Sequence, residues 1–361
     1  MRLKKSPKYH KFSWMFFLPI ILSLIGLFFV FESSSVKSFQ EFNDSFHYFK
    51  LQAIWIGLGI ICMVFFSFFD YHNLYYLSLI FMLSTIVLLL FVLIPGIGYT
   101  AGGARRWIDL GMINLQPTEL AKFSVIIYLS SWFTQRERRR FFSFLILLSM
   151  LVFLIILQPD MGTAMIIFLL SISIYFYAGI DLHYLLFLAP ASALGFFILI
   201  KISPYRLRRF TAFLNPQNDP LGIGYHINQI LISLAAGGIF GQGIGTSRQK
   251  YLFLPEAHTD SIFAIIAEEF GFIGCIFLFV LFFSLIFNAY KIIARAPDRF
   301  GRLLAGGIFA FFNLQIIINL GSMVNIMPLT GVPLPFISYG GSNLLVSFAL
   351  VGILLNIAKK S

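Results

Sequence analysis

The sequence predicts an all-α polytopic integral membrane protein with about ten transmembrane helices and a large extracytoplasmic loop between helices 7 and 8. Of its 361 residues, 59% are hydrophobic and only 11% are charged, whereas soluble domains have roughly 25% charged residues. Apolar runs long enough to cross a bilayer, which takes about 20 helical residues, recur along the chain. The two cysteines, Cys62 and Cys275, lie inside such runs and are too few and too far apart for a disulfide framework or a thiolate metal site.

Ten apolar runs have the length and composition of transmembrane helices. The first could also be a signal peptide, because it follows a basic stretch, but it is long and lacks an Ala-x-Ala cleavage site. The eighth is long enough to tilt or to extend beyond the lipid. We therefore expect a single membrane domain over residues 1–361, with helices at 13–31, 51–69, 73–94, 117–133, 141–158, 162–180, 183–201, 259–290, 303–325 and 342–358.

The distribution of Lys and Arg predicts the orientation of these helices. If the N-terminus is cytoplasmic, fifteen basic residues fall in cytoplasmic segments, whereas the short outer loops hold only Lys37, Lys50, Arg105 and Arg106. This positive-inside bias places both termini in the cytoplasm and the loop 202–258 outside. The net charge of +11 suits an anionic membrane surface or an anionic substrate. It is too diffuse to indicate nucleic acid binding, and the sequence has neither a finger motif nor an RNA-stacking motif.

The loop 202–258 is the one extensive polar segment, and a loop of this length is usually functional or disordered. Apolar residues recur at helical spacing over 225–236, which predicts a short amphipathic helix that either lies at the membrane interface or packs on the outer rim of the bundle. The pattern Gly241-x-Gly243-x-Gly245 follows no strand, so it indicates a flexible turn rather than a phosphate loop. The basic residues of the loop would contact an anionic substrate or lipid headgroups; they include Arg206, Arg208, Arg209, Arg248 and Lys250.

Asp260 lies where this loop enters the eighth apolar run, so it places a carboxylate at a membrane boundary. An ionisable residue at membrane depth is costly and indicates a functional site when it borders a water-accessible cavity. Glu268 follows eight residues later, about 12 Å along a helix axis, so the two carboxylates cannot form a close pair. We expect Glu268 to lie deeper in the bundle among polar neighbours.

Three further stretches place polar groups or irregular backbone near the membrane. Glu119 and Lys122 are three residues apart and can pair on one helical face, either as a structural pair or with Lys122 free to meet a phosphate. Asp160 either caps the helix that follows it or supplies a second carboxylate on the outer side. The segment 328–342 contains three prolines and three glycines, so its backbone is non-helical and must line a cavity or be covered by protein.

Six motifs, in this order along the chain, resemble the SEDS family (shape, elongation, division and sporulation), which includes FtsW, RodA and SpoVE. The resemblance covers most of the chain. The motifs are Arg105-Arg106-Trp107-Ile108, Gln116-Pro117-x-Glu119-Leu120-x-Lys122, Gln158-Pro159-Asp160-x-Gly162-Thr163, Asp219-Pro220-x-Gly222-x-Gly224-Tyr225, Leu254-Pro255-Glu256-Ala257-His258-Thr259-Asp260 and Gly331-Val332-Pro333-Leu334-Pro335-Phe336-Ile337-Ser338-Tyr339-Gly340-Gly341.

The resemblance implies a ten-helix fold and the polymerisation of lipid II into glycan strands outside the bacterial inner membrane. It also implies partners: a single-pass class B penicillin-binding protein and other divisome or elongasome membrane proteins. The essential aspartate of the family matches Asp260. Ala257 is more similar to the division branch, FtsW, than to RodA. Ser261 departs from the phenylalanine that usually follows the aspartate.

Sugar transfer from a lipid pyrophosphate needs one base for the acceptor hydroxyl and positive charge or a metal ion for the departing phosphates. We therefore expect Asp260 to act as the general base or as a ligand of a divalent cation, Mg²⁺ or Mn²⁺. Two alternatives remain: a lipid II flippase, although no inverted repeat is evident, and a non-enzymatic scaffold that activates a transpeptidase. The residues expected to contact substrate are Arg105, Arg106, Lys122, Glu119, Asp160, Arg206, Arg248, Lys250, His258 and Ser338.

Overall fold

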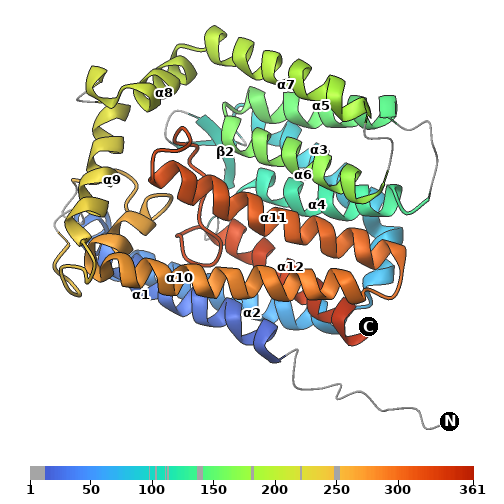
Figure 1. Ribbon diagram of the computed structural model, residues 1–361, viewed down its shortest axis with the longest axis horizontal. Coiled ribbons are helices and arrows are strands. Elements are labelled where there is room, and N and C mark those ends of the chain that lie inside the picture. The colour runs from blue at the N-terminus through green and yellow to red at the C-terminus, as the bar shows by residue number, and fades with distance from the viewer. Residues whose placement is uncertain are drawn as a thin grey trace.

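The computed structural model describes residues 13–361 except 97, 102–103, 110, 112–113, 136–140, 180–182, 220–221 and 248–252. Each predicted transmembrane run coincides with one helix, and these helices form one bundle (Figure 1). They are α1 (Ser13–Phe42), α2 (His47–Phe68), α3 (Tyr71–Leu93), α4 (Pro117–Trp132), α5 (Phe141–Leu157), α6 (Met161–Tyr177), α7 (His183–Ile202), α10 (Ile262–Arg295), α11 (Arg299–Met323) and α12 (Gly341–Lys359).

Six of the described helices are individually long and apolar enough to cross a membrane, namely α1, α2, α3, α10, α11 and α12. The later part of α7 and the following α8 (Pro204–Leu214) form a pair bent by 106° that would be a seventh span. The helices α4, α5 and α6 have 16 or 17 residues each, about 25 Å along the axis. The prediction of a polytopic, helical integral membrane protein is confirmed.

The end of the bundle that carries the 202–258 segment, called the loop end below, holds one helix that the sequence analysis predicted, α9, and several elements that it missed. Besides α8, it contains the 3₁₀ turn η1 (Pro216–Asn218) and α9 (Ile223–Gly237). A small antiparallel sheet in the order β1 (Gly98–Ala101), β2 (Ala104–Asp109), β3 (Asn114–Leu115) joins α3 to α4. The start of α1 and the end of α12 lie at the opposite end (Figure 1).

The helix predicted at 225–236 corresponds to α9, which packs against α10. Of the two interpretations of this segment, the helix packed on the bundle is therefore the one observed. Its buried face contains Ile227, Ile230 and Ser233. Ser233 is the polar residue of this face, and its buried hydroxyl donates to the Gln229 carbonyl oxygen at 2.9 Å.

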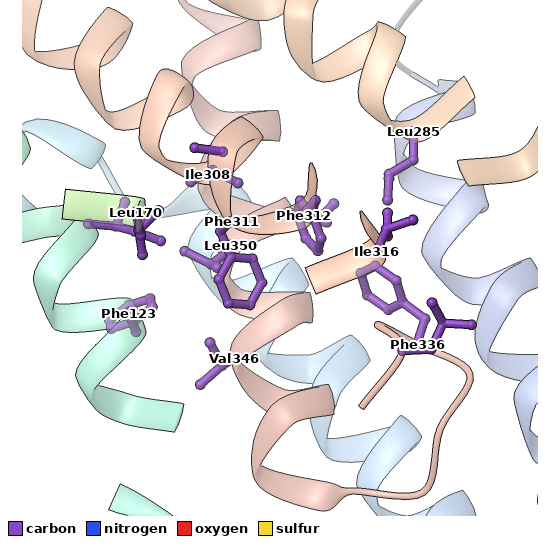
Figure 2. Close-up of a cluster of buried hydrophobic side chains, with 14 of the residues drawn as sticks. Phe123, Leu170, Leu285, Ile308, Phe311, Phe312, Ile316, Phe336, Val346 and Leu350 are labelled. Atoms are coloured by element: carbon purple, nitrogen blue, oxygen red, sulfur yellow. The ribbon is translucent and has the colours of Figure 1, made fainter. Parts of the chain in front are cut away.

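Close helix packing in the core depends on small residues. A Cβ atom on Gly352 of α12 would lie 2.4 Å from the Met63 carbonyl oxygen of α2, and one on Gly59 of α2 would lie 2.3 Å from the Phe348 ring. Such small residues let backbones approach within a membrane, where van der Waals packing drives helix association. Figure 2 shows the adjoining apolar cluster, in which Phe336 stacks on Phe312 with ring centroids 5.6 Å apart.

Phe336 belongs to the irregular segment between α11 and α12, which was expected to line a cavity or to be covered by protein. Residues 334–338 are all buried, so the second of these expectations is confirmed for that stretch. A Cβ atom on Gly26 of α1 would lie 2.6 Å from the Ile337 Cα, so α1 covers this backbone directly. The non-helical chain is thus shielded from lipid.

The long helix α10 is broken at Gly271, whose φ of +63° and ψ of −161° are non-helical. The glycine-rich turn after α9 fills the break: the Gln242 and Gly243 amides donate to the Glu268 and Glu269 carbonyl oxygens, both at 3.0 Å. In return, the Phe272 amide donates to the Gly238 carbonyl oxygen at 2.9 Å. The glycines expected to make a flexible turn instead pack directly against the α10 backbone at the break. A Cβ atom on Gly241 would lie 2.1 Å from the Glu269 carbonyl oxygen, so a residue with a side chain could not approach as closely.

Candidate active site

Asp260 lies at the loop end, in the turn that precedes α10. The Asn319 side chain of α11 donates one hydrogen bond to the Asp260 carbonyl oxygen at 2.9 Å and another to the Val332 carbonyl oxygen at 2.8 Å. Next to Val332, Gly331 has a φ of +72°, and a Cβ atom there would lie 3.9 Å from Asp260 Oδ2. The carboxylate is therefore placed between the start of α10, the outer part of α11 and the segment 329–332.

The electrostatic environment of Asp260 suits a group that exchanges protons near neutral pH. Burial raises the pKa of Asp260 to about 6, with the Glu256 carboxylate adding to the increase and the Arg209 guanidinium opposing it. The Thr259 hydroxyl oxygen lies 2.8 Å from Glu256 Oε2 and 3.3 Å from Asp260 Oδ1, so one hydroxyl bridges the two acidic residues. Glu256 has a positive φ of +49°, an uncommon conformation for a residue other than glycine.

Among the described residues, Arg209 of α8 is the basic residue whose charge acts on the Asp260 carboxylate. Its Nη1 donates to the Leu329 carbonyl oxygen at 3.1 Å, which ties α8 to the segment beside Asp260, and its guanidinium lies 4.8 Å from the Tyr205 ring centroid. The expected substrate residue Arg206 points elsewhere on the same helix and donates to the Leu199 and Ile156 carbonyl oxygens. Arg248 and Lys250, also expected to contact substrate, lie outside the described residues.

Two histidines complete the surroundings of the turn. Burial lowers the pKa of His258 and of His226 to about 4, so both imidazoles are neutral at pH 7. His258 packs its ring against Tyr48 of α2 and Tyr339, with centroids 4.9 and 5.6 Å away. His226 of α9 shares a hydrogen bond of 2.8 Å with the Ser261 hydroxyl. These contacts hold the turn from both sides, and they give His258 a packing role beside the carboxylate.

The Glu119 and Lys122 side chains form a buried pair inside the bundle. They are 2% and 1% exposed, and Lys122 Nζ lies 2.7 Å from Glu119 Oε1. Asn343 of α12 donates to Glu119 Oε2 at 2.8 Å and approaches Gln315 Oε1 of α11 at 3.4 Å. The expected pairing is confirmed, and it links three helices. Contact of either residue with a substrate stays a prediction.

Two of the remaining predicted site residues, Asp160 and Arg106, have structural partners. Asp160 caps α6 by accepting from the Thr163 amide and hydroxyl at 3.0 and 2.9 Å, which confirms the capping interpretation. Arg106 of β2 donates to the Gln158 and Pro159 carbonyl oxygens, whereas Arg105 is exposed.

Two other polar side chains turn inward. The buried Ser338 hydroxyl accepts from the Leu334 amide at 2.9 Å, within the segment between α11 and α12. Glu268 is buried in α10 and accepts from the Ser247 hydroxyl at 2.5 Å, as expected for a carboxylate satisfied by a polar neighbour.

A family model described as cell cycle protein, covering FtsW, RodA and SpoVE, matches residues 12–361. The chain belongs to this family. Stage V sporulation protein E of Bacillus subtilis (strain 168) is 38% identical over 95% of this chain and 96% of its own length. The probable peptidoglycan glycosyltransferase FtsW of Coxiella burnetii is 39% identical over 99% of both chains.

Solved structures of family members have the same fold. A chain from a peptidoglycan synthase complex, in a study of how polymerisation and crosslinking are coordinated, matches with a TM-score of 0.79 and 27% identity over 96% of this chain and 97% of its own. The rod shape determining protein RodA of Thermus thermophilus matches with a TM-score of 0.71 and 25% identity over 98% and 99% of the two chains. The likeness thus extends over the whole membrane domain.

The turn that contains Asp260 offers carboxylate and hydroxyl oxygen atoms, which are the ligands that a hard divalent cation prefers. Among the described residues, no group of three or more His, Cys, Asp and Glu side chains could hold a metal ion. Asp260 and Glu256, however, both approach the Thr259 hydroxyl. Magnesium is commonly bound by one or two carboxylates together with substrate phosphates and water. Asp260 and Glu256 would therefore hold such an ion only together with a phosphate-bearing substrate.

Proposed function

We propose that this chain is a peptidoglycan glycosyltransferase that polymerises lipid II into glycan strands and releases polyprenyl pyrophosphate. Family membership supports the activity, because full-length relatives carry the name peptidoglycan glycosyltransferase. The observation that carries the proposal is the Asp260 carboxylate, whose pKa of about 6 suits a general base at neutral pH. Arg209 beside it supplies positive charge for a phosphate.

The loop end would face the outside of the bacterial cytoplasmic membrane. The distribution of basic residues supports this orientation, because Lys359, Lys360, Lys291 and Arg295 lie near the opposite end and the N-terminal stretch is also basic. Asp260, α8 and α9 would then meet lipid II in the outer leaflet. Both termini would be cytoplasmic.

In the proposed reaction, Asp260 accepts the proton of the acceptor sugar hydroxyl as its oxygen attacks the anomeric carbon of the donor sugar. The new glycosidic bond forms as the bond from that carbon to the pyrophosphate oxygen breaks, and the electron pair leaves with the pyrophosphate. Arg209 would stabilise this developing charge through its planar guanidinium. In the alternative role, Asp260 is a cation ligand instead of the base, and a divalent cation held by Asp260 and Glu256 would supply positive charge for the phosphates.

The raised pKa predicts how the polymerisation rate depends on pH. A general base must be ionised, so the rate should be maximal above pH 6 and should fall about tenfold for each unit of acidification well below it. Initial rates between pH 5 and 8 with saturating lipid II measure this profile. A rate that stays constant from pH 7 to 5 would exclude ionisation of Asp260 as a requirement.

Purified protein given lipid II in detergent tests the proposal itself. A polymerase makes glycan strands there, whereas a flippase has no second compartment and a scaffold alone makes none. The assay should include a cognate class B penicillin-binding protein, because we propose this single-pass transpeptidase as the partner on the basis of the matched synthase complex. Absence of polymer from the complex, with and without added Mg²⁺ or Mn²⁺, would overturn the proposed activity.

A chelator arm addresses the cation. Loss of polymer on chelation that returns with Mg²⁺ or Mn²⁺ would support ion binding at Asp260 and Glu256. Unchanged polymerisation would leave Asp260 as the base without a metal.

Ala257 supports a role in division, and complementation of strains depleted of the division or the elongation protein separates the two roles.

A further inference from the structure

Asn319 makes a contact with the proposed catalytic turn that its sequence position does not reveal. It lies near the end of α11, 59 residues after Asp260, and its side chain is fully buried. One amide nitrogen donates to the carbonyl oxygens of both Asp260 and Val332, at 2.9 and 2.8 Å. Both hydrogens of the amide group are therefore used to join two segments that are otherwise separate in the chain.

The two acceptors lie on the two sides of the carboxylate. Asp260 is in the turn before α10, and Val332 follows Gly331, whose added Cβ atom would lie 3.9 Å from Asp260 Oδ2. The amide orientation is unambiguous, because rotating it would bring an acceptor oxygen against two carbonyl oxygens. Asn319 Oδ1 has no hydrogen-bond partner among the described residues.

We propose that Asn319 is a positioning residue that fastens the Asp260 backbone to the 329–332 segment and thereby fixes the distance of the carboxylate from that segment. The expected effect of Asn319 on catalysis rests on the proposed function, but its effect on the position of Asp260 does not. Removing both hydrogen bonds lets the turn and the segment separate and water reach the carboxylate. An error of about 1 Å in the placement of a reacting group can cost as much as 100-fold in rate.

The charged and titratable groups around Asp260 come from its own turn, α8 and α9. The turn contributes Glu256 and the neutral His258, and α8 contributes Arg209. The neutral His226 of α9 bonds the adjacent Ser261. From α11 and the 329–332 segment come Asn319 and Thr330, which do not titrate. Loosening the turn therefore chiefly reduces the burial of Asp260, so its pKa should fall from about 6 toward its ordinary value.

Thermal unfolding in detergent between about pH 4 and 8 measures this change without any catalytic assay. The test compares wild type, Asp260→Asn, Asn319→Ala and the double variant. Because the folded-state pKa of Asp260 exceeds the unfolded value, ionisation destabilises the folded protein, so Asp260→Asn should be the more stable at pH 7. This advantage should disappear as the pH falls through 6 toward 4. The histidines are common to both proteins, so their titration cancels in the difference.

The pH above which this difference becomes constant reports the folded-state pKa of Asp260, and in the Asn319→Ala background we expect that pH to move down from about 6 by about one unit. Asn319→Gln keeps the amide donors, so the pKa of Asp260 in this variant should lie between its values in Asn319→Ala and in wild type. Asn313→Ala is the matched control, since Asn313 lies on the same helix and its side chain donates to the Phe309 carbonyl oxygen of that helix, with no bond to another of the described segments. A difference that still becomes constant only above about pH 6 in Asn319→Ala would overturn the proposal, even if that variant is less stable overall.

If Asn319→Ala does not fold, Asn319→Ser retains one donor and carries the same test. In the polymerisation assay, kcat should fall roughly tenfold while the KM for lipid II changes less, because the residue acts on the placement of the base. The pH of half-maximal rate should follow the folded-state pKa obtained from the unfolding measurements. Lack of polymer from wild type would contradict the proposed function alone, because the unfolding cycle does not depend on it.

Discussion

Replacement of Asp260 by Asn is expected to reduce the polymerisation rate at pH 7 by about 100-fold or more. The amide has the size of the carboxylate but cannot accept a proton from the acceptor hydroxyl, and general base catalysis contributes about 10² to 10⁴ in rate. Glycan strands formed from lipid II, measured as initial rates in the complex with a class B penicillin-binding protein, give the ratio. The pH dependence below 7 should disappear together with the activity.

Asp109→Asn is the control for this substitution. Asp109 ends β2 at the loop end, is exposed, and accepts from the Gly111 amide, so its charge should not matter to the rate. Asp260→Asn should also be no less stable than wild type at pH 7, since burial of the ionised carboxylate is unfavourable. A folded variant with near-normal polymerisation would remove Asp260 from the mechanism.

Lys122→Met is expected to destabilise the protein by about 3–5 kcal/mol, because it leaves the Glu119 carboxylate buried without its ionic partner. Glu119→Gln should cost a similar amount by leaving the ammonium group unpaired. The double variant should be more stable than the sum of these costs implies, since it removes both charges together. Denaturation monitored by retained helicity and by thermal unfolding in detergent measures the three differences.

Lys291→Met provides the matched control for this cycle. Lys291 lies on α10 with its ammonium 3.9 Å from the Phe287 ring centroid, and it is exposed, so its loss should change stability by less than about 0.5 kcal/mol. Additive costs in the Glu119–Lys122 cycle would show that the pair is not coupled. A stable Lys122→Met variant that binds lipid II poorly would instead support the earlier expectation that Lys122 contacts a phosphate.

The transmembrane helices could be predicted because a single requirement, burial of apolar side chains in lipid, acts on every residue of each run. The same requirement predicted the position of Asp260 at a boundary and the cover over residues 334–338. The extension of α1 to Phe42, beyond the apolar run that ends near residue 31, was missed because buried Ser33, Ser34 and Ser38 interrupt the hydrophobic pattern.

The surroundings of Asp260 depend on contacts between distant segments, for which a single sequence carries no direct signal. From the sequence, Arg206 and Arg209 were equivalent basic residues of the loop. In the structure both lie on α8, where their side chains point in different directions and have different partners. Asn319 lay in the middle of an apolar run, where one amide is compatible with many roles. The small sheet was missed because β1 and β2 are short strands in a segment between two strong helix signals.

The break in α10 has a consequence for how the protein adapts to its membrane. Before Gly271, residues 262–269 are buried in protein; after it, side chains such as Phe272, Ile273 and Phe283 are exposed on the surface of the bundle. A change in bilayer thickness is accommodated mainly by tilting of lipid-exposed helices. The turn after α9 is hydrogen-bonded to α10 on both sides of the break, so we expect the exposed part of α10 to tilt together with α9 rather than to bend independently at Gly271.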